Sequence, residues 1–195
     1  MTIDPRFTDS ESGIVGLIAQ NLETEYVGSD DLQWAESPFG WIKTRPPRQI
    51  GAIGERIVSK WALSKDFTVR RSPDSDADRI IQGHRIEIKL STLWADDGLY
   101  KFQQIRDQNY EYVFCIGISP FEVHAWFIPK SELVATRPGL SHQHGGASGS
   151  DTMWLSVDQL DVHDWLKPFG GTLTKVQALI LAAGKGQHVG KLLKD

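Results

Sequence analysis

Residues 73–91 read PDSDADRIIQGHRIEIKLS, and this stretch decides the expected fold. Two short apolar-rich runs flank the Gln82–Gly83 pair, which is the pattern of a β-hairpin with a two-residue turn. With that turn, Asp78 is expected to face Glu87 across the hairpin. Because side chains alternate along a strand, Glu87 and Lys89 share one face with Asp78. The hairpin therefore presents two carboxylates and an ammonium group together.

Two facing carboxylates repel each other, so the pair needs a compensating cation or a raised pKa. Hard oxygen ligands suit Mg²⁺, which takes one or two carboxylates, keeps several waters and completes its shell with substrate phosphate oxygens. Lys89 lies one pleat further along, where it can orient or help deprotonate an attacking water. The alternative is a surface ion pair between Asp76 and Lys89 on a solvated sheet face. The hairpin register and the neighbouring segments favour the catalytic interpretation.

The composition is that of a soluble globular protein. The chain has 195 residues, of which 40% are hydrophobic and 24% are charged, and this length fits one domain. No run is long enough to span a membrane, and the acidic beginning lacks the features of a signal peptide, so we expect a cytoplasmic protein. Cys115, the single cysteine, lies in an apolar run. It excludes an internal disulfide and is expected to be buried and inert.

The net charge of −4 is distributed unevenly. Residues 1–40 contain eight acidic residues against one basic residue, Arg6, whereas residues 41–71 contain eight basic residues against Glu55 and Asp66. The basic segment comes directly before the carboxylate hairpin. A basic approach to an acidic centre is what a phosphodiester substrate requires. Solvated faces of an ordinary helix and strand are the alternative.

Hydrophobic periodicity and turn residues predict the remaining elements. Helices are expected at 12–24, 49–65 and 99–107, a short helix at 129–133 and a helix at 173–183; strands at 67–70, 112–119 and 123–128; mixed signals at 153–166; an irregular segment at 27–47; and a mobile loop at 137–151. In that loop, His142 and His144 are too few for a metal site, and a flap that orders on DNA is preferred to a zinc site. An idle linker is equally compatible with the loop.

Glu55 lies on the helix expected at 49–65, off its apolar stripe. It shares a flank with the small residues Gly51, Ser59 and Ala62, which permit close approach to a sheet and would aim Glu55 toward the carboxylates. A plain surface glutamate is the alternative.

The order of these segments resembles the PD-(D/E)XK nuclease superfamily, with type II restriction endonucleases as the most similar branch. The resemblance rests on G-x-x-G-E at 51–55, D-R-I-I-Q-G-H-R-I-E-I-K-L-S at 78–91 and F-Q-Q-I-R at 102–106, and covers about residues 48–130. It implies an α/β fold with a mixed central β-sheet flanked by helices, restriction-endonuclease-like. It also implies DNA cleavage with one or two Mg²⁺ ions per active site.

The resemblance also assigns roles to individual residues. It implies that the metal ligands are the carboxylates of Asp78 and Glu87 and the backbone carbonyl of Ile88. It also implies that Lys89 is the lysine of the signature, and that Glu55 on the helix and Gln104 further along the chain join the site. Pro73-Asp74 reproduces the letters of the motif, but the register places Asp74 opposite Ser91. Asp78 is therefore assigned, with Asp76 and Asp74 as weaker alternatives.

The expected organisation has three segments within a single domain. Residues 1–47 serve dimerisation or DNA contact, 48–135 form the nuclease core, and 136–195 complete the domain with a loop, a strand and a helix. The expected partner is double-stranded DNA, bound by a homodimer, with no membrane partner. The expected DNA contacts come from basic residues and loop histidines: Lys43, Arg45, Arg48, His142 and His144.

The preferred function is a sequence-specific type II restriction endonuclease. A structure-specific repair or junction-resolving nuclease is the first alternative, and an inactive nuclease-like DNA-binding protein is the second. The recognition sequence, the cut pattern and any dependence on base modification stay open.

Overall fold

The computed structural model describes residues 33–95, 97–134, 136–142 and 152–187. The helix expected at 12–24 lies outside these ranges. The helices are α3 (Gly40–Lys43), α4 (Pro47–Ser64) and α5 (Leu173–Gly184), with 3₁₀ turns at Lys130–Glu132 and Lys167–Phe169. The strands are β1 (Val69–Arg71), β2 (Arg79–Ile81), β3 (His84–Thr92), β4 (Leu99–Arg106), β5 (Tyr112–Ile118), β6 (Val123–Pro129), β7 (Leu140–His142) and β8 (Thr152–Asp158).

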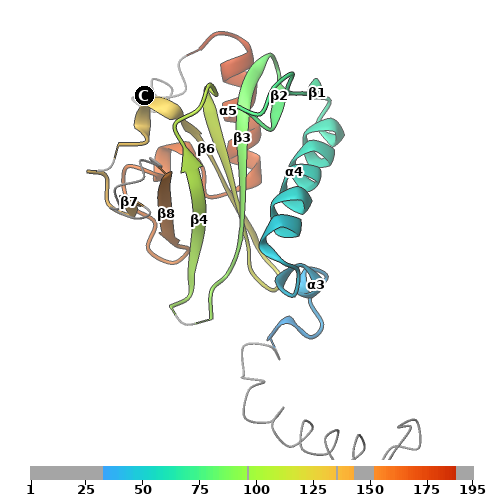
Figure 1. Ribbon diagram of the computed structural model, residues 1–195, viewed down its shortest axis with the longest axis vertical. Helices are drawn as coiled ribbons and strands as arrows, with labels where there is room; N and C mark the ends of the chain where they lie inside the picture. The colour runs from blue at the N-terminus through green and yellow to red at the C-terminus, as the bar shows by residue number, and fades with distance from the viewer. Residues whose placement is uncertain (1–32, 96, 135, 143–151, 188–195) are drawn as a thin grey trace, which may run out of the picture.

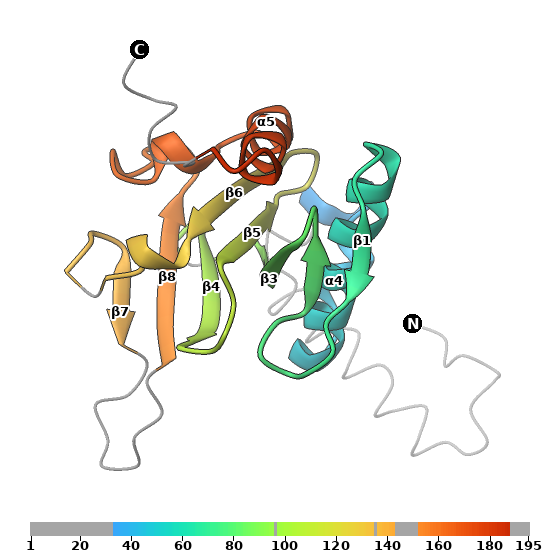
Figure 2. The ribbon, with the colours of Figure 1, turned by 90° about the horizontal axis from the view of Figure 1, so that it is seen from above.

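The central sheet has five strands in the order β1-β2-β3-β5-β6. Strands β3 and β5 are parallel and the other neighbours are antiparallel, so the sheet is mixed. Helices α4 and α5 lie on one face, and a second sheet with the order β4-β8-β7 lies against the other (Figures 1 and 2). The predicted α/β class, with a mixed central sheet flanked by helices, is confirmed. The second sheet is an addition that the sequence did not predict.

Strand β5 is the centre of the core. Val113 to Ile118 are all buried, and β5 pairs with β3 on one side and β6 on the other. Such complete burial explains the continuous apolar run from which the strand was predicted. Cys115 has no exposed surface, and burial raises the pKa of its thiol, as expected for an inert cysteine.

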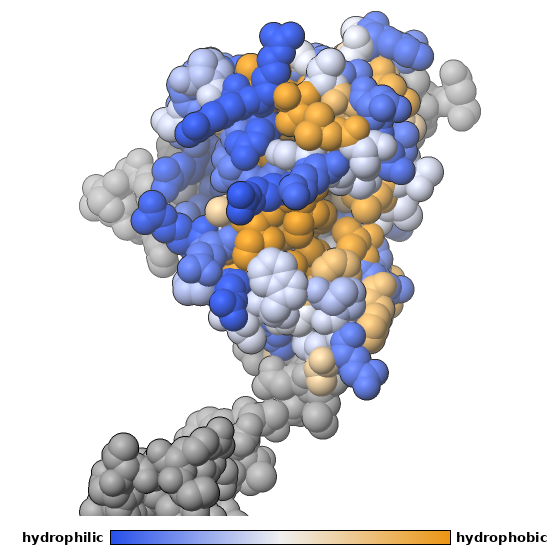
Figure 3. Space-filling model, turned by 90° about the vertical axis from the view of Figure 1, so that its right-hand side faces the viewer, coloured by the Kyte–Doolittle hydropathy of each residue, from blue (hydrophilic) through white to orange (hydrophobic). Residues whose placement is uncertain are grey.

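The two helices leave an apolar groove between them on their face of the sheet. It has a volume of about 220 Å³ and is lined by side chains that include Ile57 of α4, Phe114 of β5 and Leu173 of α5. Figure 3 shows apolar side chains gathered on the side of the molecule that carries α4. None of the helices in the described ranges combines the length and hydropathy that a bilayer-spanning segment needs.

The hairpin forms as predicted, with one correction. Ile81 pairs with His84, and both turn residues have positive φ, 52° for Gln82 and 87° for Gly83, as in a type I′ turn. The ladder ends at the pair Arg79 and Ile86, so the predicted facing pair one step further does not form. Instead, the Asp78 N–H donates to the Ile86 carbonyl at 2.9 Å. Asp78 therefore stands at the entry to the strand.

The helix predicted at 99–107 is wrong, because these residues form β4. Leu99, Phe102 and Ile105 have helical spacing, which suggested an amphipathic helix. In the structure, the buried positions follow strand alternation at Tyr100 and Phe102 and then shift by one residue to Ile105, because a β-bulge interrupts the pairing with β8. One inserted residue thus turned a strand pattern into an apparent helix pattern.

Three smaller expectations also change. The irregular segment expected at 27–47 contains the short helix α3, and the loop expected at 137–151 begins with strand β7. Of the strand and helix signals at 153–166, the strand signal corresponds to β8, and these residues contain no helix. The strands expected at 112–119 and 123–128 and the helices expected at 49–65 and 173–183 are confirmed.

Helix α4 approaches the sheet through Gly54, which corrects the expectation that Gly51 and Ser59 permit the contact. A Cβ atom at Gly54 would lie 2.7 Å from the Cβ atom of Leu90 on β3, whereas a Cβ atom at Gly51 would meet nothing within 4 Å. Gly54 is thus the position at which the helix and the strand come closest.

This contrast predicts opposite effects of two alanine substitutions on stability. Gly54→Ala should destabilise the fold, because overpacking typically costs about 1–3 kcal/mol and exceeds the gain in helix propensity. Gly51→Ala should stabilise it by up to about 1 kcal/mol, because only the propensity changes. Urea unfolding midpoints measure both effects. Equal midpoints for the two variants would contradict the contact.

Candidate active site

The candidate site is a cleft along the open edge of β3. Strand β2 pairs with β3 only as far as Ile86, so among the residues that the structure describes no strand pairs with this edge from Glu87 to Thr92. Helix α4 forms one bank and strand β4 the other. The cleft has a volume of about 680 Å³. It exists because β2 is short.

The structure brings the predicted catalytic residues together in this cleft. Side chains or main chain of seven of the residues predicted from the sequence line it: Arg48, Glu55, Asp78, Glu87, Ile88, Lys89 and Gln104. They come from α4, the segment before β2, β3 and β4, which lie far apart in the sequence.

Asp78 reaches the open edge through a backbone contact. Its Oδ2 accepts a hydrogen bond from the Ile88 N–H at 2.7 Å. Because the N–H and C=O of one strand residue point to the same side, the Ile88 carbonyl also faces the cleft. A carboxylate and a carbonyl oxygen are thereby placed side by side.

Glu87 and Lys89 form a largely buried ion pair on the face of β3 that is turned toward β4. Lys89 Nζ lies 2.7 Å from Glu87 Oε1, and the exposed fraction is 19% for the Lys89 side chain and 9% for the Glu87 side chain. Burial raises the pKa of the Glu87 carboxyl above its usual value; Lys89 opposes this change, whereas Asp78 and Glu55 add to it. The cleft thus holds several carboxylates close enough to disfavour one another's ionisation.

Glu55 is held by Arg79, a residue that the sequence analysis did not select. Arg79 donates to Glu55 Oε2 at 3.1 Å, to Ser59 Oγ at 3.0 Å and to the Asp78 carbonyl at 2.6 Å. Burial and the charge of Asp78 raise the pKa of Glu55, and Arg79 lowers it. The guanidinium group therefore ties α4 to the hairpin entry and fixes Glu55 beside Asp78.

The two alternative aspartates lie outside the cleft lining. Asp74 accepts from Arg85 at 2.5 Å and from the Asp76 N–H at 3.0 Å, which binds it to the outer part of the hairpin. Asp76 does not line the cleft either. The assignment of Asp78 stays a prediction, and its position supports it over both alternatives.

The bulge in β4 directs two glutamines toward the site. Gln103 and Gln104 both line the cleft, and Gln104 has a φ of 56°, in the left-handed region that few residues other than glycine adopt. Bulges often re-aim side chains beside active sites. Gln104 thus reaches the cleft from a strand and not from the predicted helix.

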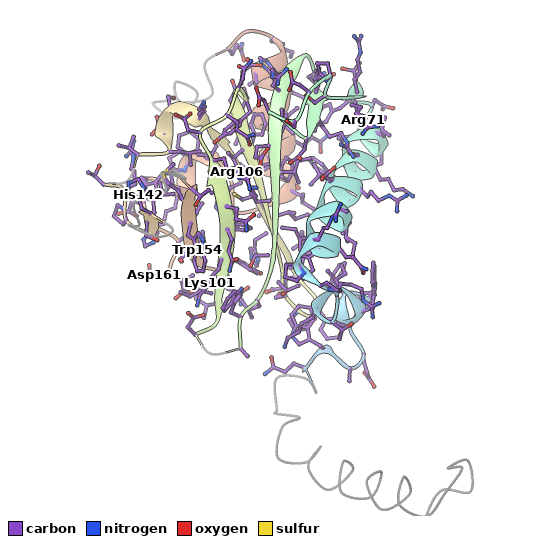
Figure 4. All side chains as sticks on the ribbon, in the orientation of Figure 1. Arg71, Lys101, Arg106, His142, Trp154 and Asp161 are labelled. Carbon is purple, nitrogen blue, oxygen red and sulfur yellow. The ribbon has the colours of Figure 1, made fainter. Side chains whose placement is uncertain are left out.

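The predicted DNA contacts are placed differently from one another. Arg48 lines the cleft, whereas Arg45 binds the Trp41 carbonyl at 3.2 Å and Lys43 lies 5.4 Å from the ring of Trp34, both outside the cleft lining. His142 is exposed on β7, distant from α4 (Figure 4). His144 falls outside the described residues.

The sequence did not predict two further residues of the cleft, because residues 99–107 were expected to form a helix and not strand β4. Trp94 and Lys101 line the cleft beside Gln103, at the turn that joins β3 to β4. Alternation of Tyr100 with Lys101 and Phe102 was the available strand signal, but the bulge obscured it.

The oxygen donors at the open edge fit Mg²⁺. Among the described residues, no group of three or more His, Cys, Asp and Glu side chains is arranged to hold a metal ion. The predicted set is smaller and consists of the Asp78 and Glu87 carboxylates and the Ile88 carbonyl. One or two carboxylates, with waters and substrate oxygens in the remaining positions, is a usual arrangement for Mg²⁺.

The ion pair predicts how the Glu87 pKa responds to its neighbour. Removing the ammonium group with Lys89→Ala should raise this pKa further, because Lys89 favours the ionised carboxyl. Loss of the Glu87 charge on acidification should then begin at a higher pH than in the wild type. Carbon-13 NMR titration of labelled glutamates measures the change. Glu111, which binds His84 outside the cleft, serves as the reference and should titrate alike in both proteins.

Comparisons with known proteins give little beyond the geometry. No family model matches the sequence, and no curated protein matches it either. Among solved structures, the chain is similar to a bacterial homing endonuclease, I-Ssp6803I, with 12% sequence identity and a TM-score of 0.45 over 73% of this chain and 99% of that chain.

Proposed function

We propose that the protein is a Mg²⁺-dependent endonuclease that hydrolyses phosphodiester bonds in double-stranded DNA, as a type II restriction enzyme acting as a homodimer. One observation carries the proposal. Asp78, Glu87, Ile88 and Lys89 line one cleft, where Asp78 is bound to the Ile88 N–H and Lys89 is paired with Glu87. Carboxylates that can hold a divalent ion, next to a partly buried lysine, suit the hydrolysis of a phosphodiester.

Each side chain has a distinct part in this proposal. Asp78 and Glu87 would hold the metal, and the Ile88 carbonyl would complete the protein's share of ligands. When bound there, Mg²⁺ would supply positive charge to activate water and stabilise the leaving 3′ oxygen. Lys89 gives up its ion pair with Glu87. Its ammonium group then orients the attacking water and offsets charge on the phosphate. Glu55 and Gln104 line the cleft from opposite banks, and we propose that they orient water by hydrogen bonds.

Basic residues at the start of α4 are proposed to guide the DNA backbone. Arg48 is exposed in the first turn of α4, a turn without acidic residues, and it lines the cleft. The amino end of a helix also favours negative charge. Arg45 precedes this turn and is exposed. We place both on the path of the phosphates, with Lys43 behind them, and we propose that His142 and His144 read bases.

This path predicts a specific salt dependence. Arg48→Ala and Arg45→Ala should each weaken binding to all duplexes alike and reduce the slope of log affinity against log salt by about one unit. Arg70→Ala, at an exposed position of β1 outside the cleft lining, is the matched control and should leave the slope unchanged. Fluorescence anisotropy across a salt series measures the slopes. Unchanged slopes for both Arg48→Ala and Arg45→Ala would remove these residues from the DNA path.

The proposal is tested by incubating the protein with unmethylated plasmid and phage DNA in Mg²⁺ and in EDTA. Discrete fragments in Mg²⁺ and intact DNA in EDTA are expected. A four-way junction of unrelated sequence is the comparison substrate. Cutting at one short palindrome and not at the junction supports restriction, whereas cutting the junction regardless of sequence supports the repair alternative. No cleavage of any DNA would contradict the nuclease proposal.

A further inference from the structure

The turn between β3 and β4 brings an aromatic ring and a cation to the mouth of the cleft. Lys101 Nζ lies 4.2 Å from the centre of the Trp94 ring and 2.6 Å from Asp97 Oδ2. Figure 4 shows Lys101 on β4 near this turn. Both Trp94 and Lys101 line the same cleft as Glu87 and Lys89. An indole and an ammonium group thus stand together beside the predicted reaction centre.

The turn holds Trp94 in a defined place. The Trp94 N–H donates to the Leu99 carbonyl at 3.0 Å, and the Trp94 carbonyl accepts from the Gly98 N–H at 2.9 Å. The preceding residue, Leu93, donates to the Ile118 carbonyl at 2.9 Å, which ties the turn to the central sheet. Trp94 nevertheless remains 36% exposed. The backbone of Trp94 is thus fixed, while part of this aromatic residue stays accessible in the cleft.

The opposite bank of the cleft is open at one position and cationic at another. Gly51 of α4 lines the cleft, and a Cβ atom there would meet nothing within 4 Å. Arg48 stands one turn before it on the same bank. A substrate in the cleft would therefore pass between a cationic, open helix surface and the Trp94 and Lys101 pair.

We propose, on the basis of the proposed nuclease function, that Trp94 and Lys101 form a subsite for the nucleotide next to the scissile phosphate. The base of that nucleotide leaves its stack in the duplex and packs on the Trp94 ring, and the phosphate of that nucleotide replaces Asp97 on Lys101. Every base has a π-face, so such stacking tolerates any sequence, and a lysine beside it neutralises backbone charge. The subsite positions the substrate strand and takes no part in the chemical step.

The test is a cycle that pairs protein variants with modified DNA. Duplexes that contain the mapped cleavage site carry one abasic position each, stepped across the site, and binding is measured in Ca²⁺. Trp94→Ala should weaken binding of the intact duplex by about 5- to 150-fold, the range for loss of one base–aromatic stack. One abasic position should weaken wild-type binding by a similar factor and have no further effect in Trp94→Ala. Trp94→Phe should recover most of the affinity.

Lys101 is tested in the same way with a neutral methylphosphonate at the adjacent phosphate. Lys101→Met and the neutral linkage should each weaken binding, and together they should weaken it no more than either alone. Phe121→Ala removes an aromatic side chain that is 68% exposed outside the cleft lining, and it should leave the affinity unchanged. Circular dichroism confirms that each variant is folded.

The outcomes separate this inference from the proposed function. The subsite would be overturned if the effects of Trp94→Ala and of every abasic position were additive, or if Trp94→Ala bound DNA as tightly as Phe121→Ala does. Cleavage by the wild type would still support the nuclease in either case. Failure of the wild type to bind and cleave any DNA would overturn both.

Discussion

Asp78→Asn is expected to abolish DNA cleavage while the fold and the affinity for DNA in Ca²⁺ stay close to those of the wild type. The Asn oxygen can still accept the hydrogen bond from the Ile88 N–H that Asp78 now accepts at 2.7 Å, so the hairpin entry keeps its geometry. The negative charge that would hold Mg²⁺ is lost. Because even outer-shell changes at metal sites commonly cost 10- to 100-fold, loss of a ligand should reduce the rate by more than about 100-fold. Single-turnover cleavage in Mg²⁺ measures the effect.

The neighbouring aspartates provide matched controls. Asp76→Asn and Asp74→Asn change the same functional group in the same segment, but neither residue lines the cleft. Both should cut at rates near that of the wild type. Normal cleavage by Asp78→Asn together with inactive Asp76→Asn would show that the metal carboxylate has been assigned to the wrong aspartate.

Lys89→Ala should lower the cleavage rate by about 10²- to 10⁴-fold, the usual contribution of a positioned proton-transfer or charged group. Lys89 Nζ already lies 2.7 Å from Glu87 in a largely buried part of the cleft, so its charge acts with little screening by water. Affinity for DNA in Ca²⁺ should change little, because the group is proposed to act on the water and on transition-state charge. Parallel measurements of rate and affinity separate the two effects.

Lys60→Ala is the control for this prediction, since Lys60 is exposed on α4 and does not line the cleft. It should cut at the wild-type rate. If Lys89→Ala loses affinity in proportion to its loss of rate, Lys89 positions phosphate and does not act on the chemical step.

The sequence by itself determined the elements whose pattern is local. The Gln-Gly turn set the register of the hairpin, because both turn residues must adopt positive φ and few pairs of residues do so readily. The uninterrupted apolar run became β5, since a strand covered on both faces has no polar position. Helical spacing at Ile53 and Ile57 similarly identified α4.

The same local patterns identified most residues of the candidate site. Glu87 and Lys89 had to share a face because strand side chains alternate, and Glu55 was found on the helix next to them. Local patterns could not choose among Asp74, Asp76 and Asp78, because the ladder ends before that segment and pairing no longer fixes it.

Only the tertiary structure decided what surrounds these residues. The bulge that makes β4 a strand arises from its pairing with β8, some fifty residues away in the sequence, so no local period could reveal it. The contacts of Arg79 with Glu55 and Ser59 depend on how α4 lies across the hairpin. The cleft itself follows from the shortness of β2 and from β4 lying opposite α4. Its shape is set by packing between elements distant in the chain, which periodicity and spacing do not encode.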